Sequence, residues 1–348
     1  MERKIVKCCL LTMSLVLISL FSFGQKKNLR QYYYWTNQAE LAICDSNYHR
    51  ASDCYDKAFG CHRPFSMHDY HAFILNAKYY PNEKRALQSF HRLIQTGEKI
   101  EWYKEDSVLF APIWSQMKSM ADTTKRVFST ELRDAFKGIS DSDQKVRREM
   151  FDNDDIEDKV IRYTDSVNLE KYKTLFQTNP EISDYTVGTA PVLHTFLIHA
   201  CRQFLFDPKD ILYDEVINGN IEASRYVLIE DICRGDFINP YLGEKCKTVY
   251  GTNVSCFFVI DSIGFIIQPE NLKEVNINRK KINMSETWED HAKKIAYRYL
   301  RESEFVFYNT NRLIYMPEDA KRKVAETMEL IDKGIIKGKY YIIPEEIR

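Results

Sequence analysis

The chain has 348 residues, of which 44% are hydrophobic and 28% charged, the composition of a globular protein rather than a disordered or low-complexity one. Its formal net charge of −1 at pH 7 argues against the broad basic face that non-specific nucleic-acid binding requires, so we expect no nucleic-acid partner. Only 12 glycines and 10 prolines interrupt the chain, which favours a helix-rich fold.

The first 24 residues have the layout of a secretory signal peptide. Arg3, Lys4 and Lys7 precede an uncharged, largely apolar run over 8–23, and Gly24 is a small residue just before the expected cut. That run is shorter than the roughly 20 residues that a membrane-spanning helix needs. We therefore predict that residues 1–24 are removed, that no membrane span remains, and that the mature protein is exported to the periplasm or the cell exterior.

The cysteines that follow this segment are compatible with disulfides in an oxidising compartment. Seven of them remain after the expected cleavage, so at least one thiol is left over or pairs between chains. Cys44, Cys54 and Cys61 lie close enough in sequence for one local disulfide, and they are equally compatible with small buried apolar positions.

The segment after the signal has small residues where two antiparallel helices would touch. Ala39 and Ala51 are such positions, and Asn47 falls where the turn between the helices should lie. The spacing predicts helices near 31–44 and 48–60.

The same pattern recurs further along the chain. Ala86 and Phe90 stand 35 residues after Ala51 and Tyr55, close to the 34-residue period of tetratricopeptide repeats. Residues 25–125 therefore resemble a short tetratricopeptide-like module. Such a module implies either a concave surface for a protein or peptide partner, or a helical stack that packs on the next domain.

The remainder, over 126–348, reads as a helical domain with one β-hairpin. We expect a helix that starts at Thr130 and ends at Gly138, followed by a second helix, and further on an apolar central helix over 190–206. Two β-branched and aromatic runs predict a hairpin near 254–268. The expected fold class is mainly α, with a tetratricopeptide-like helical hairpin module followed by this domain.

Several polar residues stand at unusual places for a simple helical bundle. Asp143, Gln144 and Arg147 are spaced to share one helix face. His199 lies inside the most apolar helix, where both ring nitrogens need partners, and Asp231 lies on a later apolar helix. We hypothesise that these side chains converge.

In this order the residues resemble the motifs of an uncharacterised bacterial family, a domain of unknown function, over about 130–300. The matching positions are Asp143, Gln144, Arg147, Asp165, Asn168, Val187, Gly188, His199, Ala200, Asp231, Tyr250, Gly251, Thr252, Pro269 and Arg279. Ile232 and Thr248 depart from the Arg and Gln of the family pattern, which implies altered or impaired contacts there. The family carries no established activity, so the resemblance implies a shared site only.

Hydrolase-like chemistry is one function that these residues allow. Asp231 would hold one nitrogen of His199, leaving the other as a general base. Arg147 would bind an anionic group, and the turn from Tyr250 to Thr252 would offer N–H donors to an oxyanion.

Two other interpretations remain open for the polar residues: a ligand-binding pocket that includes Asp143, Gln144, Arg147, Tyr250 and Thr252, or a buried network that fixes helix packing. No cofactor or metal motif occurs, so we predict no cofactor and no metal. The first functional hypothesis is accordingly an exported binding or interaction protein, and the alternative is a hydrolase-like enzyme using His199 and Asp231.

Overall fold

The computed structural model describes residues 28–152, 158–188, 195–202, 206–234, 248–252, 256–260, 262–301, 304–305, 307, 314–315 and 320–345. The predicted signal peptide over 1–24, Cys246, and residues 190–194 and 203–205 of the predicted apolar segment lie outside these residues. A first helix covers 28–44. The other elements are α2 Tyr48–Cys61, α3 Ser66–Ile74, the π-helical η1 Leu75–Tyr79, α4 Glu83–Gln95, the 3₁₀ turn η2 Ile100–Tyr103, α5 Trp114–Thr123, α6 Thr130–Asp152, α7 Asp158–Thr178, α8 Asp184–Val187, α9 Thr195–Arg202, α10 Lys209–Ile217, α11 Ala223–Arg234, β1 Phe257–Ile260, β2 Ile263–Ile267, α12 Leu272–Lys281, α13 Trp288–Leu300, β3 Ile314–Tyr315, α14 Ala320–Asp332 and β4 Gly338–Ile342.

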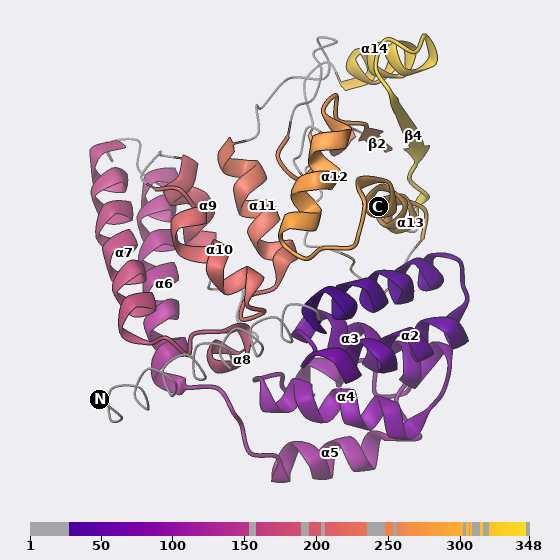
Figure 1. The fold of residues 1–348 in the computed structure, drawn as a ribbon, viewed down its shortest axis with the longest axis vertical. Helices are drawn as coiled ribbons and strands as arrows, with labels where there is room; N and C mark the ends of the chain where they lie inside the picture. Colours follow the sequence, from indigo (N-terminus) through magenta and orange to yellow (C-terminus); the bar gives the residue numbers. More distant parts are fainter. Residues whose placement is uncertain are drawn as a thin grey trace, which may run out of the picture.

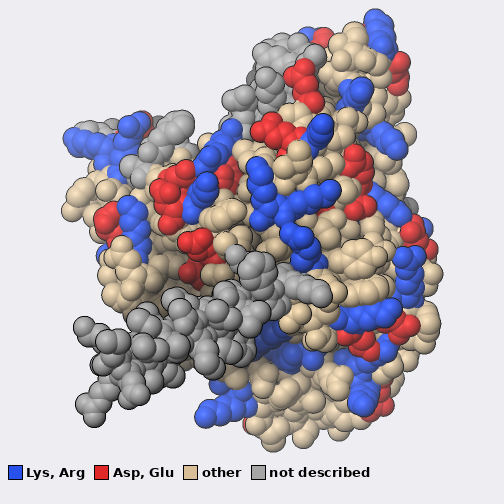
Figure 2. Space-filling view, viewed as in Figure 1, with Lys and Arg blue, Asp and Glu red and all other residues tan. Residues whose placement is uncertain are grey.

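The fold is mainly α with one β-hairpin, as the sequence predicts. In Figure 1 the helices up to α5 form one group, α6 and α7 form a long pair at the opposite side, and α9 to α11 lie between that pair and α12. The face in Figure 2 carries Lys and Arg side chains next to Asp and Glu over most of its described surface, in keeping with the near-neutral formal charge.

The first helices begin and end close to the predicted positions. The first helix ends at residue 44 and α2 begins at Tyr48, where the side chain of Asn47 accepts a hydrogen bond from the backbone N–H of Arg50 at 3.2 Å. Asn82 caps α4 in the same way. These caps satisfy backbone donors that a helix cannot satisfy itself.

One predicted helix boundary is wrong. The sequence predicts a break at Gly138, but α6 runs unbroken from Thr130 to Asp152 and packs along α7. A glycine in a helix interior costs only about 1 kcal/mol relative to alanine, and burial of Phe136 and Ile139 on the side of the core offsets that cost.

A disulfide joins Cys201 of α9 to Cys233 of α11. Cys44, Cys54 and Cys61 are all free thiols, so no local disulfide links them, and Cys54 is buried as a small apolar residue would be. The disulfide fixes together the two helices that carry His199 and Asp231.

The hairpin of β1 and β2 is confirmed, with Phe257 opposite Ile266 in antiparallel register. It sits in a four-stranded sheet of order β3-β1-β2-β4, in which β4 is antiparallel to β2 and β3 parallel to β1. Because successive side chains point to opposite faces of a strand, Phe257 packs towards α13 and Phe258 towards α14.

Among the described residues, no helix combines the length and the apolar character needed to cross a membrane.

Candidate functional site

Helices α6, α7 and α9 bring together five of the polar residues that the sequence singles out. Nδ1 of His199 lies 2.9 and 3.1 Å from the two carboxylate oxygens of Asp143. Gln144 donates to Asp143 at 2.7 Å, and Arg147 donates to it from one turn further along α6. The guanidinium of Arg147 also binds Asp165 of α7 through two hydrogen bonds of 3.0 and 2.8 Å.

Burial in this cluster decreases from the carboxylates to the imidazole. The side chains of Asp143 and Asp165 are fully buried, whereas those of Arg147 and His199 are 17% and 24% exposed. The buried carboxylate holds Nδ1, which fixes the orientation and the tautomer of the ring. No hydrogen bond to Nε2 of His199 occurs within the described part of the chain. The ring therefore presents one free nitrogen at a partly exposed position.

Asn168 adds an unsatisfied acceptor beside this cluster, one turn after Asp165 on α7. Its side chain is fully buried, and its Nδ2 donates to the backbone of Ile139 at 3.5 Å. Its Oδ1 has no hydrogen-bond partner. Buried polar atoms are nearly always paired, so this acceptor is a place for a buried water molecule.

Asp231 does not orient His199, and that part of the hydrolase hypothesis is wrong. Both of its oxygens bind the segment after α11: they accept from the backbone N–H groups of Val249, Tyr250 and Thr252 at 2.8, 2.8 and 2.5 Å. The hydroxyls of Thr248 and Thr252 donate to it as well, each at 2.6 Å. A carboxylate with five donors has no capacity left for an imidazole. Asp143 takes the place that the sequence assigned to Asp231.

The predicted oxyanion donors and the predicted anion site are also occupied. The N–H groups of Tyr250 and Thr252 donate to Asp231, and that of Gly251 donates to the Thr248 hydroxyl. The guanidinium of Arg147 donates to the carboxylates of Asp143 and Asp165. These groups therefore hold the protein together in this structure, and none of them points a free donor at His199.

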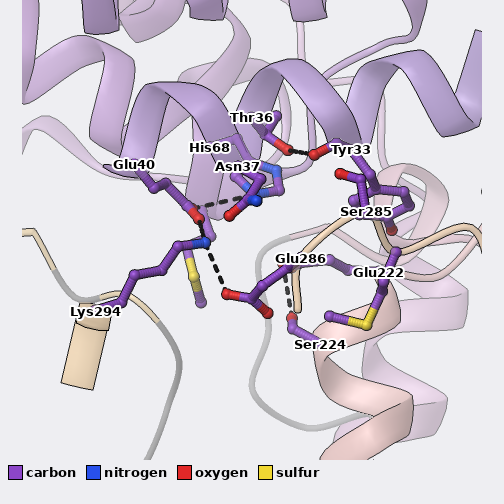
Figure 3. Close-up of a pocket in the computed structure, with 12 residues that line it drawn as sticks. Tyr33, Thr36, Asn37, Glu40, His68, Glu222, Ser224, Ser285, Glu286 and Lys294 are labelled. Atoms are coloured by element: carbon purple, nitrogen blue, oxygen red, sulfur yellow. Dashed lines mark hydrogen bonds and ion pairs between the residues drawn. The ribbon is translucent and has the colours of Figure 1, made fainter. Parts of the chain in front are cut away.

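A second polar cluster, which the sequence analysis missed, lies where the N-terminal helices meet α13. Lys294 is 1% exposed and forms ion pairs with Glu40 of the first helix and with Glu286, the latter at 2.8 Å (Figure 3). Glu286 also binds Arg279 at 2.7 Å, and Arg279 donates to the backbone carbonyl of Tyr250 at 2.7 Å. Two carboxylates and two cations thus balance in the interior, as buried charges require.

The pKa values in this second cluster follow from that balance. Burial alone would raise the pKa of Glu40, but Lys294 and the imidazoles of His71 and His68 lower it to about 2. Burial lowers the pKa of His68 to about 4, against the opposing pull of Glu40. The Glu40–Lys294 pair is therefore charged, and His68 is neutral, at pH 7. The cavity beside them has a volume of about 20 Å³, room for about one water molecule.

This second cluster fills the inner face of the N-terminal module. The module's helices also bind later parts of the chain through Asn37, which donates to Asp290 at 2.9 Å, and through Tyr33, which accepts from the N–H of Ala223 at 2.9 Å. His71 packs edge-on against Phe307, with the ring centres 5.2 Å apart. The face formed by these residues is thus packed against the chain's own second half and is closed to a peptide.

No local signal in the sequence pointed to Glu40 and Lys294, because each lies on an ordinary amphipathic helix. Only their burial distinguishes these two charged side chains from others, and burial depends on the fold. By contrast, the motif spacing correctly grouped Asp143, Gln144 and Arg147.

Within the described ranges, no three His, Cys, Asp or Glu side chains are arranged to hold a metal ion. The chain matches no known family model, no curated protein and no solved structure.

Proposed function

We propose that the cluster of α6, α7 and α9 is a hydrolase-type site in which His199 is the general base. The observation that carries the proposal is the pairing of Nδ1 with the buried Asp143 while Nε2 stays unbonded on a partly exposed ring. In such a pair, Nε2 takes the proton of an attacking water, and Asp143 stabilises the imidazolium that results.

The surrounding residues support this role by positioning. Gln144 and Arg147 hold Asp143, and Asp165 holds Arg147, so the carboxylate keeps one orientation towards the ring. These residues are also the ones that the resemblance to an uncharacterised family groups together, and they converge here from positions 143 to 199 of the chain.

The test compares the His199→Ala variant with the unmodified mature chain on a panel of ester, amide and phosphoester substrates. We expect turnover to fall by about 10²- to 10⁴-fold, the usual loss for a general base, with little change in melting temperature. His49→Ala is the control, because that imidazole is on α2 with 66% of its side chain exposed. An unmodified chain that turns over none of the panel argues against the proposal. A large drop in melting temperature without a loss of turnover would assign the cluster to packing.

An interaction role for residues 25–125 is a second candidate, restricted to the outer surface of the tetratricopeptide-like module. The observation that favours it is an open hollow of about 340 Å³ between α2, α3 and α4, lined by Phe59, Gln88 and Arg92 among others. Pull-down with the full mature chain tests it. A Gln88→Trp variant, which fills the hollow, should lose a genuine partner, whereas Lys84→Trp, exposed on the same helix outside the lining, should keep it.

We also propose that the protein is exported, because residues 1–24 have the layout of a signal peptide. The Cys201–Cys233 disulfide supports it, because disulfides persist mainly in oxidising compartments. N-terminal sequencing of the protein from culture supernatant or periplasm should begin at Gln25, and an intact Met1 in the cytoplasmic fraction alone would contradict export.

A further inference from the structure

A separate cavity of about 220 Å³ lies between α3, the segment that contains η2, and Glu304. Aromatic side chains form much of its wall, namely Tyr70, Trp102, Tyr103 and Phe110. It is smaller than the roughly 300–1,000 Å³ of sites that enclose whole drug-sized ligands, so it suits a head group or the end of a side chain.

The charges around this cavity are unbalanced. Three carboxylates line it, those of Glu98, Asp106 and Glu304, against the single ammonium of Lys78. Lys78 is already paired with Glu304. The lining thus holds two carboxylates, those of Glu98 and Asp106, with which no cation of the lining is paired.

Glu98 lacks a close cationic partner within the described part of the chain. Only the hydroxyl of Tyr103 donates to it, at 3.4 Å, and Arg133 acts on it from a longer range. Burial raises the pKa of Glu98 to about 7 in spite of both. A cation in the cavity would compensate the desolvation of this carboxylate.

The aromatic wall is partly rigid and partly open. Tyr103 and Phe110 pack on the buried Phe73, with ring centres 5.4 and 5.1 Å apart, so their positions are fixed by the core. Trp102 is 55% exposed and makes no ring contact with the described residues. Leu109, which also lines the cavity, is 45% exposed, so Trp102 and Leu109 both leave apolar surface in water around it. Exposed apolar patches of this kind mark interaction sites.

We propose that this cavity binds an alkylammonium group, either a free amine or the ammonium end of a lysine side chain on a partner. The rings of Trp102, Tyr70 and Tyr103, which line the cavity, supply cation–π attraction, and Glu98 and Asp106 supply the opposite charge. This inference does not depend on chemistry at His199. It also concerns a different cavity from the hollow between α2, α3 and α4, so the two sites can be tested separately.

Calorimetric titration of the full mature chain tests the proposal with two isosteric probes. Choline carries the ammonium, and 3,3-dimethylbutan-1-ol replaces its nitrogen by carbon. We expect choline to bind at least about 5-fold more tightly, since cation–π pairs contribute about 1 kcal/mol or more. Equal binding of the two probes, or binding of neither, overturns the proposal. A third titration with N-acetyl-trimethyllysine amide separates the sources: tighter binding than choline indicates a protein side chain, and equal or weaker binding a free amine.

Variants then locate the site. Trp102→Ala and Glu98→Gln should each weaken choline binding by about 5-fold or more, and the exposed position of Trp102 means that the fold should survive its loss. Tyr163→Ala on α7 is the matched control, because that ring is 72% exposed and far from the lining in sequence. If choline binds but both site variants, Trp102→Ala and Glu98→Gln, bind it as the unmodified chain does, the ammonium site lies elsewhere and the assignment is wrong.

Discussion

Asp231 shows how a single buried carboxylate can determine a backbone conformation. Its carboxylate accepts hydrogen bonds from the backbone N–H groups of Val249, Tyr250 and Thr252 and from two hydroxyls. These bonds close the turn over 248–252 around Gly251, whose φ of +75° favours glycine. The sequence pattern pointed to the right residues but gave them the wrong partners. Asp143 and Asp231 are equivalent candidates for the carboxylate that holds His199 until the positions of α6 and α11 are known.

Replacement of Asp231 by alanine should therefore destabilise the fold. Three backbone N–H groups, two of them buried and that of Val249 partly buried, would lose their acceptor, which costs about 1 kcal/mol each, so we expect the free energy of unfolding to fall by about 3 kcal/mol. Urea denaturation measures the loss, and hydrogen exchange should show faster exchange at Val249 and Tyr250. Asp141→Ala, which removes a carboxylate that is 61% exposed and paired with the exposed Lys137, is the control and should cost less than about 1 kcal/mol.

Glu98 should give the protein a pH dependence of stability near neutrality. Its folded-state pKa of about 7 lies above the ordinary 4.5, so the native state binds the proton more tightly than the unfolded state. Stability is therefore gained as the pH falls from about 7 towards 4.5, by up to about 3 kcal/mol. In denaturation at pH 8 and pH 5, Glu98→Gln should lack this gain. An identical pH profile for the variant would show that Glu98 keeps an ordinary pKa.

At the scale of elements, local signals in the sequence were sufficient for most helices and for the hairpin. Asn47 marks the start of α2, and the β-branched runs mark β1 and β2. The prediction of a break at Gly138 was wrong because a glycine lowers helix propensity only modestly. The long contact between α6 and α7 stabilises α6 as one unbroken helix.

The Gly138→Ala variant should consequently be more stable than the natural chain. A Cβ at this position would meet no atom within 4 Å, and alanine is better than glycine in a helix interior by about 0.5–1 kcal/mol. Thermal denaturation should show a rise of a few degrees. Gly264→Ala provides the contrast, because its Cβ would lie 2.5 Å from the ring of Tyr299 and should destabilise the sheet. A destabilised Gly138→Ala would mean that α6 needs flexibility there.

At the scale of the whole molecule, buried ion pairs join parts of the chain that the sequence could not connect. Glu40 and Lys294 are separated by 254 residues, and neither belongs to a motif, so only the fold reveals their pairing. The same limit applies to the packing of Phe307 on His71. Secondary structure is encoded by neighbours in sequence, whereas these contacts are encoded by the tertiary arrangement.

Loss of Lys294 should weaken this junction strongly. Lys294→Met leaves the carboxylates of Glu40 and Glu286 buried without their shared ammonium, which should cost about 3–5 kcal/mol in urea denaturation. Adding Glu40→Gln should recover part of the loss. The neighbouring Lys293 is the control: it is 45% exposed and pairs with Asp45, so Lys293→Met should cost less than about 1 kcal/mol. Equal costs for the two lysines would contradict a buried ionic junction.

The closed inner face of the module has a practical consequence for laboratory work. A truncated product that stops at residue 125 would expose to solvent the carboxylate of Glu40 and the rings of Tyr33 and His71, all of which are buried in the whole protein. Such a product would adhere to unrelated proteins through surfaces that no natural partner ever meets. Bait for affinity capture should therefore retain α13 and the strands that follow it.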